Sequence, residues 1–304
     1  MGTPDFAVPC LVALHNSRHQ VLKVITQPDR PKGRGRKLTP PPIKETAMEF
    51  GYPVLQPISL QTPELMTELK SDAPDLFVVV AMGHILKPEL LQIPSHGAVN
   101  IHASLLPKYR GAAPIHWAIV NGENTSGVSS MLMADGVDTG DILLSESAPI
   151  YADDTAGSLH DRLARVGASI LIQTLDGLAD ERIAPRPQDH TQATYAPMLK
   201  KQDGHINWQL PARKLDAFIR GMTPWPGAFT FCGDKRLKIF KAHVHEADTN
   251  QQPGTILQSF PDELRVATGE GMIVITELQE ASGKRMCTPD YLCGCEMLPG
   301  TVFE

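Results

Sequence analysis

Several features that mark whole classes of protein are missing from this sequence of 304 residues. It contains no apolar run close to the roughly 20 residues that a membrane-spanning helix requires. Its start lacks a basic segment followed by an apolar core, so no secretory signal is expected. Neither the dinucleotide motif GxGxxG nor a Walker phosphate loop occurs, which argues against a dinucleotide-dependent or ATP-dependent enzyme.

Cysteine is scarce, and its spacing is not that of a disulfide framework or a zinc site. The five cysteines include no CxxC pair, so we expect reduced thiols in a cytoplasmic protein. Cys293-Gly294-Cys295 is a weak metal motif because no second pair accompanies it, and no metal is expected. A net charge of −6 argues against a general nucleic-acid coat protein, but not against a local basic patch.

The first half of the sequence alternates short apolar runs with helix-compatible segments. The overall composition, 42% hydrophobic and 20% charged, is typical of a globular protein. The alternation predicts an α/β domain with a parallel sheet. The predicted strands are residues 21–26, 76–81, 97–102 and 127–133. The predicted helices are residues 63–69 and 113–120, and one whose buried face carries Leu159, Leu163, Val166 and Ile170.

The last third of the sequence has a different pattern. A polar, proline-punctuated segment at 180–188 is predicted as a surface linker, and a short helix at 211–220 follows it. About five short strands with turns come next, which is typical of a small barrel of the OB type. We therefore predict domains at residues 1–178 and 200–304, joined by a linker at 179–199.

Asn100 and His102 stand two residues apart at the end of a predicted strand. Residues at this spacing face the same side of a strand, and α/β enzymes build their sites at strand ends. Asp138 lies in an acidic, glycine-broken loop after the next predicted strand. If parallel strands bring both loops to one sheet edge, the carboxylate can orient the imidazole and the amide can stabilise an oxyanion. Such a group suits attack of an amine on an acyl or formyl carbon, with His102 moving protons.

Each of these residues also has an ordinary interpretation. A lone histidine such as His102 is as often a surface residue or a satisfied core residue as a catalyst. Asp135, Asp138 and Asp141 could form a cation loop, but their spacing is not that of an EF-hand. Ser104 could be a hydrolase nucleophile, but it lacks the surrounding GxSxG motif.

Residues 27–44 form a second candidate site. The segment is basic and rich in glycine and proline, so regular secondary structure is not predicted there. A solvated surface loop is the simpler interpretation. The functional interpretation is a flexible arm whose arginines contact phosphates or unstacked bases, and its concentration of positive charge in an acidic chain favours that interpretation.

Together these motifs resemble the folate-dependent formyltransferase family. The resemblance rests first on Asn100-x-His102-x-Ser104-Leu105-Leu106-Pro107, followed by Asp138-Thr139-Gly140. Gly2-Thr3-Pro4-Asp5-Phe6-Ala7 and the basic segment 27–44 are similar to the branch of the family that formylates methionyl-tRNA. Further similar motifs, which extend the resemblance over nearly the whole chain, are Tyr195-Ala196-Pro197-Met198, Ile206-Asn207-Trp208, residues 223–228 and Pro299-Gly300-Thr301.

The resemblance implies a Rossmann-like catalytic domain, an OB-like C-terminal domain and a defined reaction. A formyl group would pass from 10-formyltetrahydrofolate to the methionine α-amine of initiator methionyl-tRNA, for translation initiation and without a metal. Asn100 and His102 would polarise the formyl oxygen and assist proton transfer, and Asp138 would orient His102. The protein would act as a monomer, with the C-terminal barrel as a further tRNA surface. The folate pocket would be formed by Ser104, Leu105, Leu106, Pro107 and backbone near Leu86 and Asp138, and the tRNA acceptor stem would meet Lys32, Arg34, Arg36 and Lys37.

Three departures from the family pattern accompany the resemblance. The family has a strand just before the motif at residues 2–7, and no strand-like run precedes that motif here. The sheet is therefore expected to lack its first strand, which would expose backbone groups of its neighbours. Met82 stands where the family usually has an aromatic residue, and the chain is expected to end a few residues early.

Other activities share parts of this pattern. A formyltransferase for a purine precursor or a nucleotide sugar would share Asn100, His102 and Asp138, but not the basic segment together with this C-terminal domain. A formyltetrahydrofolate hydrolase would pass the formyl group to water from the same site. An RNA-binding module with an inactive enzyme fold is a non-enzymatic alternative, against which the intact group of three residues argues.

Overall fold

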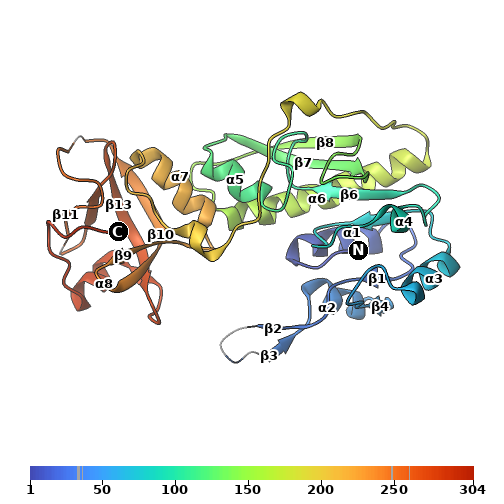
Figure 1. Cartoon of the computed structure of the whole chain (residues 1–304), viewed down its shortest axis with the longest axis horizontal. Coiled ribbons are helices and arrows are strands. Elements are labelled where there is room, and N and C mark those ends of the chain that lie inside the picture. Colours follow the sequence, from blue (N-terminus) through green and yellow to red (C-terminus); the bar gives the residue numbers. More distant parts are fainter. Residues whose placement is uncertain (33–34, 36, 248, 260) are drawn as a thin grey trace. The chain divides into compact units, whose positions relative to one another are not determined.

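The computed structural model describes residues 1–32, 35, 37–247, 249–259 and 261–304. These residues form two compact units, whose elements are labelled in Figure 1. The first unit consists of residues 1–114, 125–149 and 160–196, and the second of residues 115–124, 150–159 and 197–304. Residues 115–124 and 150–159 thus group with the C-terminal residues, whereas the division predicted from the sequence is continuous along the chain.

The first unit is built on a four-stranded sheet with the order β5-β6-β7-β8. β5 and β6 are parallel, but β7 and β8 each run antiparallel to the preceding strand. A separate parallel pair is formed by β1 (Val24–Ile25) and β4 (Val54–Leu55). The predicted α/β class is confirmed, with the correction that the fourth predicted strand is antiparallel. The strands of the sheet are β5 (Phe77–Val79), β6 (Ala98–His102), β7 (Thr125–Leu132) and β8 (Ile142–Pro149).

β8 was not predicted, because most of its residues are polar or exposed. Only Leu143 and Ala148 are fully buried along it, so it has no continuous apolar run. The helices agree better with the sequence pattern: Pro63 opens α3, and the Thr62 hydroxyl caps it by accepting a hydrogen bond from the Leu65 amide. The helical elements from the start of the chain to residue 179 are η1 (Asp5–Ala7), α1 (Val8–His15), α2 (Pro42–Glu49), α3 (Pro63–Asp72), α4 (Pro88–Leu91), α5 (Pro114–Val120) and α6 (Ala156–Ala179).

Helix α6 packs closely on the sheet of the first unit. A Cβ added to Gly167 would come within 3.0 Å of the Ile101 side chain, so the glycine permits the close approach. The predicted apolar face of this helix is present, because Leu163 and Ile170 are fully buried. The hydroxyl groups of Ser130 on β7 and Thr174 on α6 form a hydrogen bond of 2.7 Å inside this interface. The helix therefore buries one face of the strand that carries the candidate site.

Met1 and Gly2 lie between β1 and β5. The N-terminal ammonium donates to the Val78 carbonyl at 2.7 Å, and the Val80 amide donates to the Met1 carbonyl at 2.9 Å. On the other side, the Gly2 amide donates to the Ile25 carbonyl at 3.0 Å. Among the described residues, the backbone of Met1 and Gly2 provides the backbone hydrogen bonds that connect the β1-β4 pair to the main sheet.

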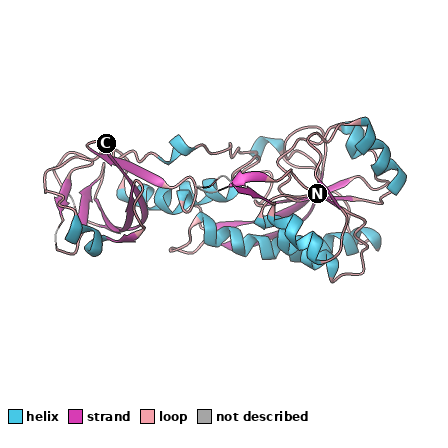
Figure 2. Cartoon of the chain, turned by 90° about the horizontal axis from the view of Figure 1, so that it is seen from below, coloured by secondary structure: helices cyan, strands magenta, loops and turns pink. Residues whose placement is uncertain are grey.

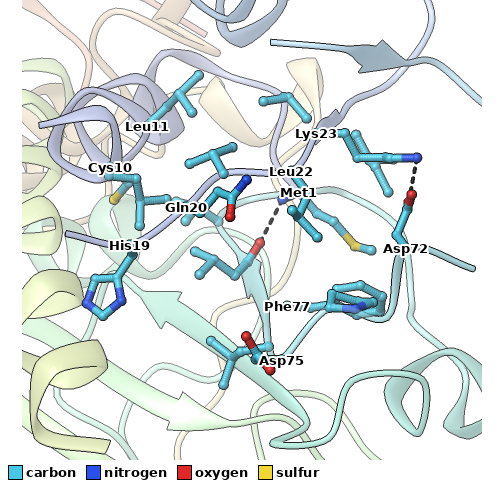
Figure 3. Close-up of a pocket in the computed structure, with 18 of the residues that line it drawn as sticks. Met1, Cys10, Leu11, His19, Gln20, Leu22, Lys23, Asp72, Asp75 and Phe77 are labelled. Atoms are coloured by element: carbon cyan, nitrogen blue, oxygen red, sulfur yellow. Dashed lines mark hydrogen bonds and ion pairs between the residues drawn. The ribbon is translucent and has the colours of Figure 1, made fainter. Parts of the chain in front are cut away.

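A cavity of about 450 Å³ lies next to Met1, lined by residues of both β1 and β5. Figure 3 shows many of the residues around it. Burial lowers the pKa of the Met1 ammonium to about 6, and it raises the pKa of the Cys10 thiol. The cavity lies where the resemblance placed a further strand ahead of residue 2. Much of its lining is apolar and includes Leu11, Leu22, Val24, Leu76 and Phe77.

The basic segment is more regular than predicted. β2 (Arg30–Lys32) pairs antiparallel with β3 (Lys37–Thr39), and α2 begins soon afterwards at Pro42. The prediction of an irregular loop is therefore wrong for these residues, because the backbone of the two short strands satisfies its own hydrogen bonds despite the prolines and glycines. Arg34 and Arg36 lie outside the described residues.

The second unit carries a curled antiparallel sheet with the order β11-β12-β13-β10-β9, with β14 paired to β13 (Figure 2). This confirms the predicted OB-like class. β9 and β10 form a hairpin, with Gly233 in the left-handed region at φ 55° in the turn. The elements from residue 190 onward are η2 (His190–Gln192), η3 (Lys201–Gly204), α7 (Ala212–Met222), β9 (Ala228–Cys232), β10 (Lys235–His245), β11 (Ile256–Gln258), β12 (Leu264–Ala267), β13 (Met272–Glu280), β14 (Met286–Cys287) and α8 (Thr288–Gly294).

No helix in the described part of the chain is both long enough and apolar enough to cross a membrane.

Candidate active site

His102 is the last residue of β6, and its side chain is buried, with 6% of the residue exposed. Its Nε2 lies 2.9 Å from the backbone carbonyl of Tyr109. Tyr109 has a left-handed backbone, with φ 58°, which is uncommon for a residue with a side chain. The turn after the strand therefore aims a carbonyl back at the imidazole and holds the ring in one orientation.

Asp138 faces the other nitrogen of the same ring. Its Oδ2 lies 3.6 Å from Nδ1 of His102, which is close enough for an ion pair but too long for a hydrogen bond. The same oxygen accepts the Gly111 amide at 2.7 Å. The second carboxylate oxygen of Asp138 has no hydrogen-bond partner among the described residues, so it is available to a substrate. The His102 ring thus faces a backbone carbonyl at Nε2 and a carboxylate at Nδ1.

The predicted meeting of His102 and Asp138 occurs, but not for the predicted reason. β7 is antiparallel to β6, so the loop after β7 leaves the sheet at the end opposite to His102. That loop, residues 133–141, turns back towards His102 before β8 begins. Asp138 itself has a left-handed backbone at φ 53° within this return.

Asn100 lies two residues before His102 on β6, on the same side of the strand. It is partly exposed, unlike its neighbours Val99 and Ile101, which are buried. In the described residues, no hydrogen bond involves its side-chain amide, although most buried amides are bonded. The two N–H donors of Asn100 are therefore available to an oxygen atom of a bound substrate.

The segment from Ser104 to Pro107 is held rigidly. The Ser104 hydroxyl donates to the Lys108 carbonyl at 2.6 Å and is almost fully buried, so it is not available as a ligand or nucleophile. The Leu106 amide donates to the hydroxyl of Ser129 on β7 at 3.1 Å, and the Leu106-Pro107 peptide bond is cis. The segment can line a pocket only through its backbone and apolar surface; the side chains of Leu106 and of Leu86 are buried, and Leu105 is partly exposed.

Sequence reasoning missed two buried residues beside the site, Arg110 and Gln188. The Arg110 guanidinium donates to Gln188 Oε1 from Nη2 at 2.6 Å and from Nε at 3.2 Å. Gln188 lies in the segment predicted as a surface linker, yet only 6% of it is exposed. Its amide donates to the backbone carbonyls of Asp138 and Gly140. The polar composition around Gln188 gave no signal of this burial.

The predicted tRNA contacts are only partly described. Lys37 is exposed on β3, and Lys32 ends β2. Among the described residues, no group of three histidine, cysteine or carboxylate side chains is arranged to hold a metal ion.

Comparison with known proteins gives a consistent result. Residues 1–175 match the family described as formyl transferase, and residues 198–296 match the formyl transferase C-terminal domain. A curated methionyl-tRNA formyltransferase of Citrifermentans bemidjiense is 50% identical over 303 residues, covering 100% of this chain and 95% of that protein.

Two solved structures share the fold at low identity. An N-formyltransferase from Helicobacter canadensis, in complex with folinic acid and dTDP-3-aminofucose, is 18% identical with a TM-score of 0.65, covering 94% of this chain and 97% of that chain. A methionyl-tRNA formyltransferase from Clostridium thermocellum is 22% identical with a TM-score of 0.51, covering 64% of this chain and 82% of that chain.

The two matched domains cover most of the chain, and the curated relative is 50% identical over 303 residues. The chain therefore belongs to the formyl transferase family, in the group of the methionyl-tRNA formyltransferases.

Proposed function

We propose that this enzyme transfers the formyl group of 10-formyltetrahydrofolate to the α-amine of methionine on initiator methionyl-tRNA. The observation that carries the proposal is the grouping of Asn100, His102 and Asp138 at the end of β6, in a chain 50% identical to a methionyl-tRNA formyltransferase. The product would be formylmethionyl-tRNA, used to initiate translation in the cytoplasm, and the enzyme would work as a monomer.

Asn100 is the group that would stabilise developing negative charge. When the amine attacks the formyl carbon, the carbonyl oxygen becomes an oxyanion, and a donor that is already in place lowers the barrier. The free side-chain amide of Asn100 supplies such a donor from a rigid strand. The bond from the formyl carbon to the folate nitrogen then breaks, and that nitrogen leaves with a proton.

His102 and Asp138 would move the protons in this reaction. The attacking amine must lose a proton, and the folate nitrogen must gain one. The free oxygen of Asp138 can accept the proton of the amine directly or through a water molecule. The pair of His102 and Asp138 would then return a proton to the folate nitrogen as its bond to the formyl carbon breaks. The Tyr109 carbonyl keeps the ring in the required orientation.

The remaining predicted residues would bind the two substrates. The backbone and apolar surface of Ser104, Leu105, Leu106 and Pro107 would line the folate pocket, with backbone at Leu86. Lys32, Arg34, Arg36 and Lys37 would contact phosphates of the tRNA acceptor stem. In the second unit, β10 carries Lys235, Lys238 and Lys241 and would add a further basic surface.

The deciding experiment is a formylation assay with 10-formyltetrahydrofolate and four acceptors. These are charged initiator tRNA, charged elongator tRNA, free methionine and a dTDP-linked amino sugar, with water alone as the control for hydrolysis. We expect rapid transfer to charged initiator tRNA and little transfer to the others. Equal or faster transfer to the amino sugar, or release of formate without an acceptor, would contradict the proposal.

A further inference from the structure

The carboxamide of Gln188 uses its full hydrogen-bonding capacity inside the first unit. Its oxygen accepts two N–H groups of the Arg110 guanidinium, and its nitrogen donates to the carbonyl of Asp138 at 2.9 Å and that of Gly140 at 2.6 Å. If the amide were flipped, its nitrogen would face the N–H donors of Arg110 and its oxygen would face the two backbone carbonyls. Only one orientation of this amide therefore fits, and it bridges the Arg110 turn to the Asp138 loop.

Arg110 is anchored at least as firmly as the glutamine. Only 3% of the residue is exposed, and its Nη2 also lies 3.0 Å from Nδ1 of His190. Its backbone exchanges hydrogen bonds with Thr194 and Ala196, so the strand-like segment around residue 195 pairs with the turn that follows β6. The guanidinium is thus a fixed point from which Gln188 reaches the loop.

The Asp138 loop has one described hydrogen bond within it beside Asp138, from the Thr139 hydroxyl to the Asp135 carbonyl at 3.2 Å, and Gln188 and Gly111 bind it from outside. Its backbone is left-handed at Asp138, a conformation that costs free energy unless neighbouring contacts enforce it. The carboxylate is tied by the Gly111 amide, which follows Arg110 directly in the chain. The same turn, residues 109–111, therefore fixes the His102 ring through Tyr109, the Asp138 side chain through Gly111 and the Asp138 backbone through Arg110 and Gln188.

From this arrangement we propose that Gln188 is a positioning residue for formyl transfer. Together with Arg110 it forms a clamp that holds the Asp138 loop, so that the carboxylate stays beside His102 in the reactive geometry. The inference rests on the proposed role of Asp138 in proton transfer. It assigns a function to a segment whose composition indicated only a surface linker.

The test compares Gln188→Glu with Gln188→Leu in steady-state kinetics. Glutamate can still accept from Arg110, but it offers no donor to the two loop carbonyls; leucine loses both sets of bonds. Because a displacement of about 1 Å can cost about 10²-fold in rate, we expect kcat to fall between about 10-fold and 100-fold in both variants. KM for tRNA and for the folate should change less than about 2-fold, because both side chains of the clamp are buried.

A readout specific to positioning comes from combining Gln188→Glu with Asp138→Asn. If the glutamine acts through Asp138, its substitution should lower kcat less than about 2-fold in the Asp138→Asn background. Hydrogen exchange of the Gly111 amide should also become faster in Gln188→Glu, because the carboxylate that accepts it is no longer held. The matched control is Gln192→Glu, at an exposed glutamine four residues away, which should leave kcat and exchange unchanged.

The possible failures are distinguishable. If the wild-type enzyme is active, two results would overturn the clamp. One is that the effects of the two substitutions on kcat multiply, and the other is that Gln188→Glu keeps wild-type kcat. Asp138→Asn with wild-type turnover, or a wild-type enzyme that does not formylate charged initiator tRNA, would instead overturn the proposed function on which the clamp rests.

Discussion

Two regions of the first unit are built in opposite ways: the site around His102 and the cavity beside Met1. Around His102, the buried polar groups of Ser104, Arg110 and Gln188 all have partners with hydrogen-bond distances of 3.2 Å or less. Beside Met1, a buried ammonium donates to one carbonyl and faces a space of about 450 Å³. The difference indicates that side-chain positions are closely fixed around His102, whereas open space remains in the packing beside Met1.

The largest effect is expected at the site. His102→Gln should lower kcat by about 10³-fold, because general acid-base groups contribute about 10²- to 10⁴-fold. Formylation of charged initiator tRNA under single-turnover conditions measures this, with His96→Gln at an exposed histidine as the control. Near-normal turnover of His102→Gln would contradict the proposed role of His102. The region around His102 would then no longer differ from the cavity by carrying the chemistry.

The next effect concerns the cavity. Adding about five residues of alternating apolar and polar character before Met1 should raise the free energy of unfolding by about 3 kcal/mol, since one or two large apolar side chains would become buried. The added backbone would continue the pairing of Met1. Its partners would be Lys23 and Ile25, along β1 and just before it, and Leu76 and Val78, along β5 and just before it. Their neighbours Val24 and Phe77 already bond to the other side.

The matched control for that extension has the same length but contains proline and aspartate, which cannot pair or be buried there. Urea unfolding measures the difference, and alkylation of buried Cys10, which lines the cavity, should become slower only with the apolar extension. Equal stability of the two extended proteins would show that the space does not accept a strand.

A smaller effect follows from the charge on the amine. Its pKa is 8.0 in an unfolded chain and about 6 when buried, so the unfolded state binds the proton first as the pH falls. Stability from this group is present above pH 8 and should decrease by about 2–3 kcal/mol towards pH 6, at about 1.4 kcal/mol per pKa unit. The difference in unfolding free energy between free and Nα-acetylated protein, followed across that range, isolates the effect, and parallel curves would contradict it.

The smallest effect is expected on the exposed β2-β3 hairpin. Lys37→Ala should raise KM for tRNA by about 2- to 5-fold and reduce the slope of affinity against salt concentration by about 1, as for loss of one phosphate contact. Folate binding should not change. Lys70→Ala, at an exposed lysine of α3, is the control, and an equal effect there would mean that the hairpin has no special role.

The parts of the fold that the sequence predicts well are those with one-sided or continuous burial. The strand at β6 and the apolar face of α6 are correct, because burial of Val99, Ile101, Leu163 and Ile170 leaves a pattern in the sequence. β8 and the β2-β3 hairpin were missed for the opposite reason. Their residues are mostly polar or exposed, and backbone pairing rather than side-chain burial makes them strands.

The candidate site divides in the same way. Asn100, His102 and Asp138 could be selected from residue type and spacing, because donors, imidazoles and carboxylates of this kind carry a known chemistry. Tyr109, Arg110 and Gln188 could not, because their roles depend on a carbonyl direction, a buried cation and an amide that reaches the loop from about 50 residues further along the chain.

By itself, the sequence determined the two domain classes and the family, and it singled out three candidate side chains, since all of these depend on local pattern and residue chemistry. Only the tertiary structure decided how the three are held. The antiparallel β7 returns its loop to His102, the clamp of Arg110 and Gln188 fixes that loop, and Met1 occupies a place between two strands. Each of these depends on hydrogen bonds between segments far apart in the chain, which local sequence does not encode.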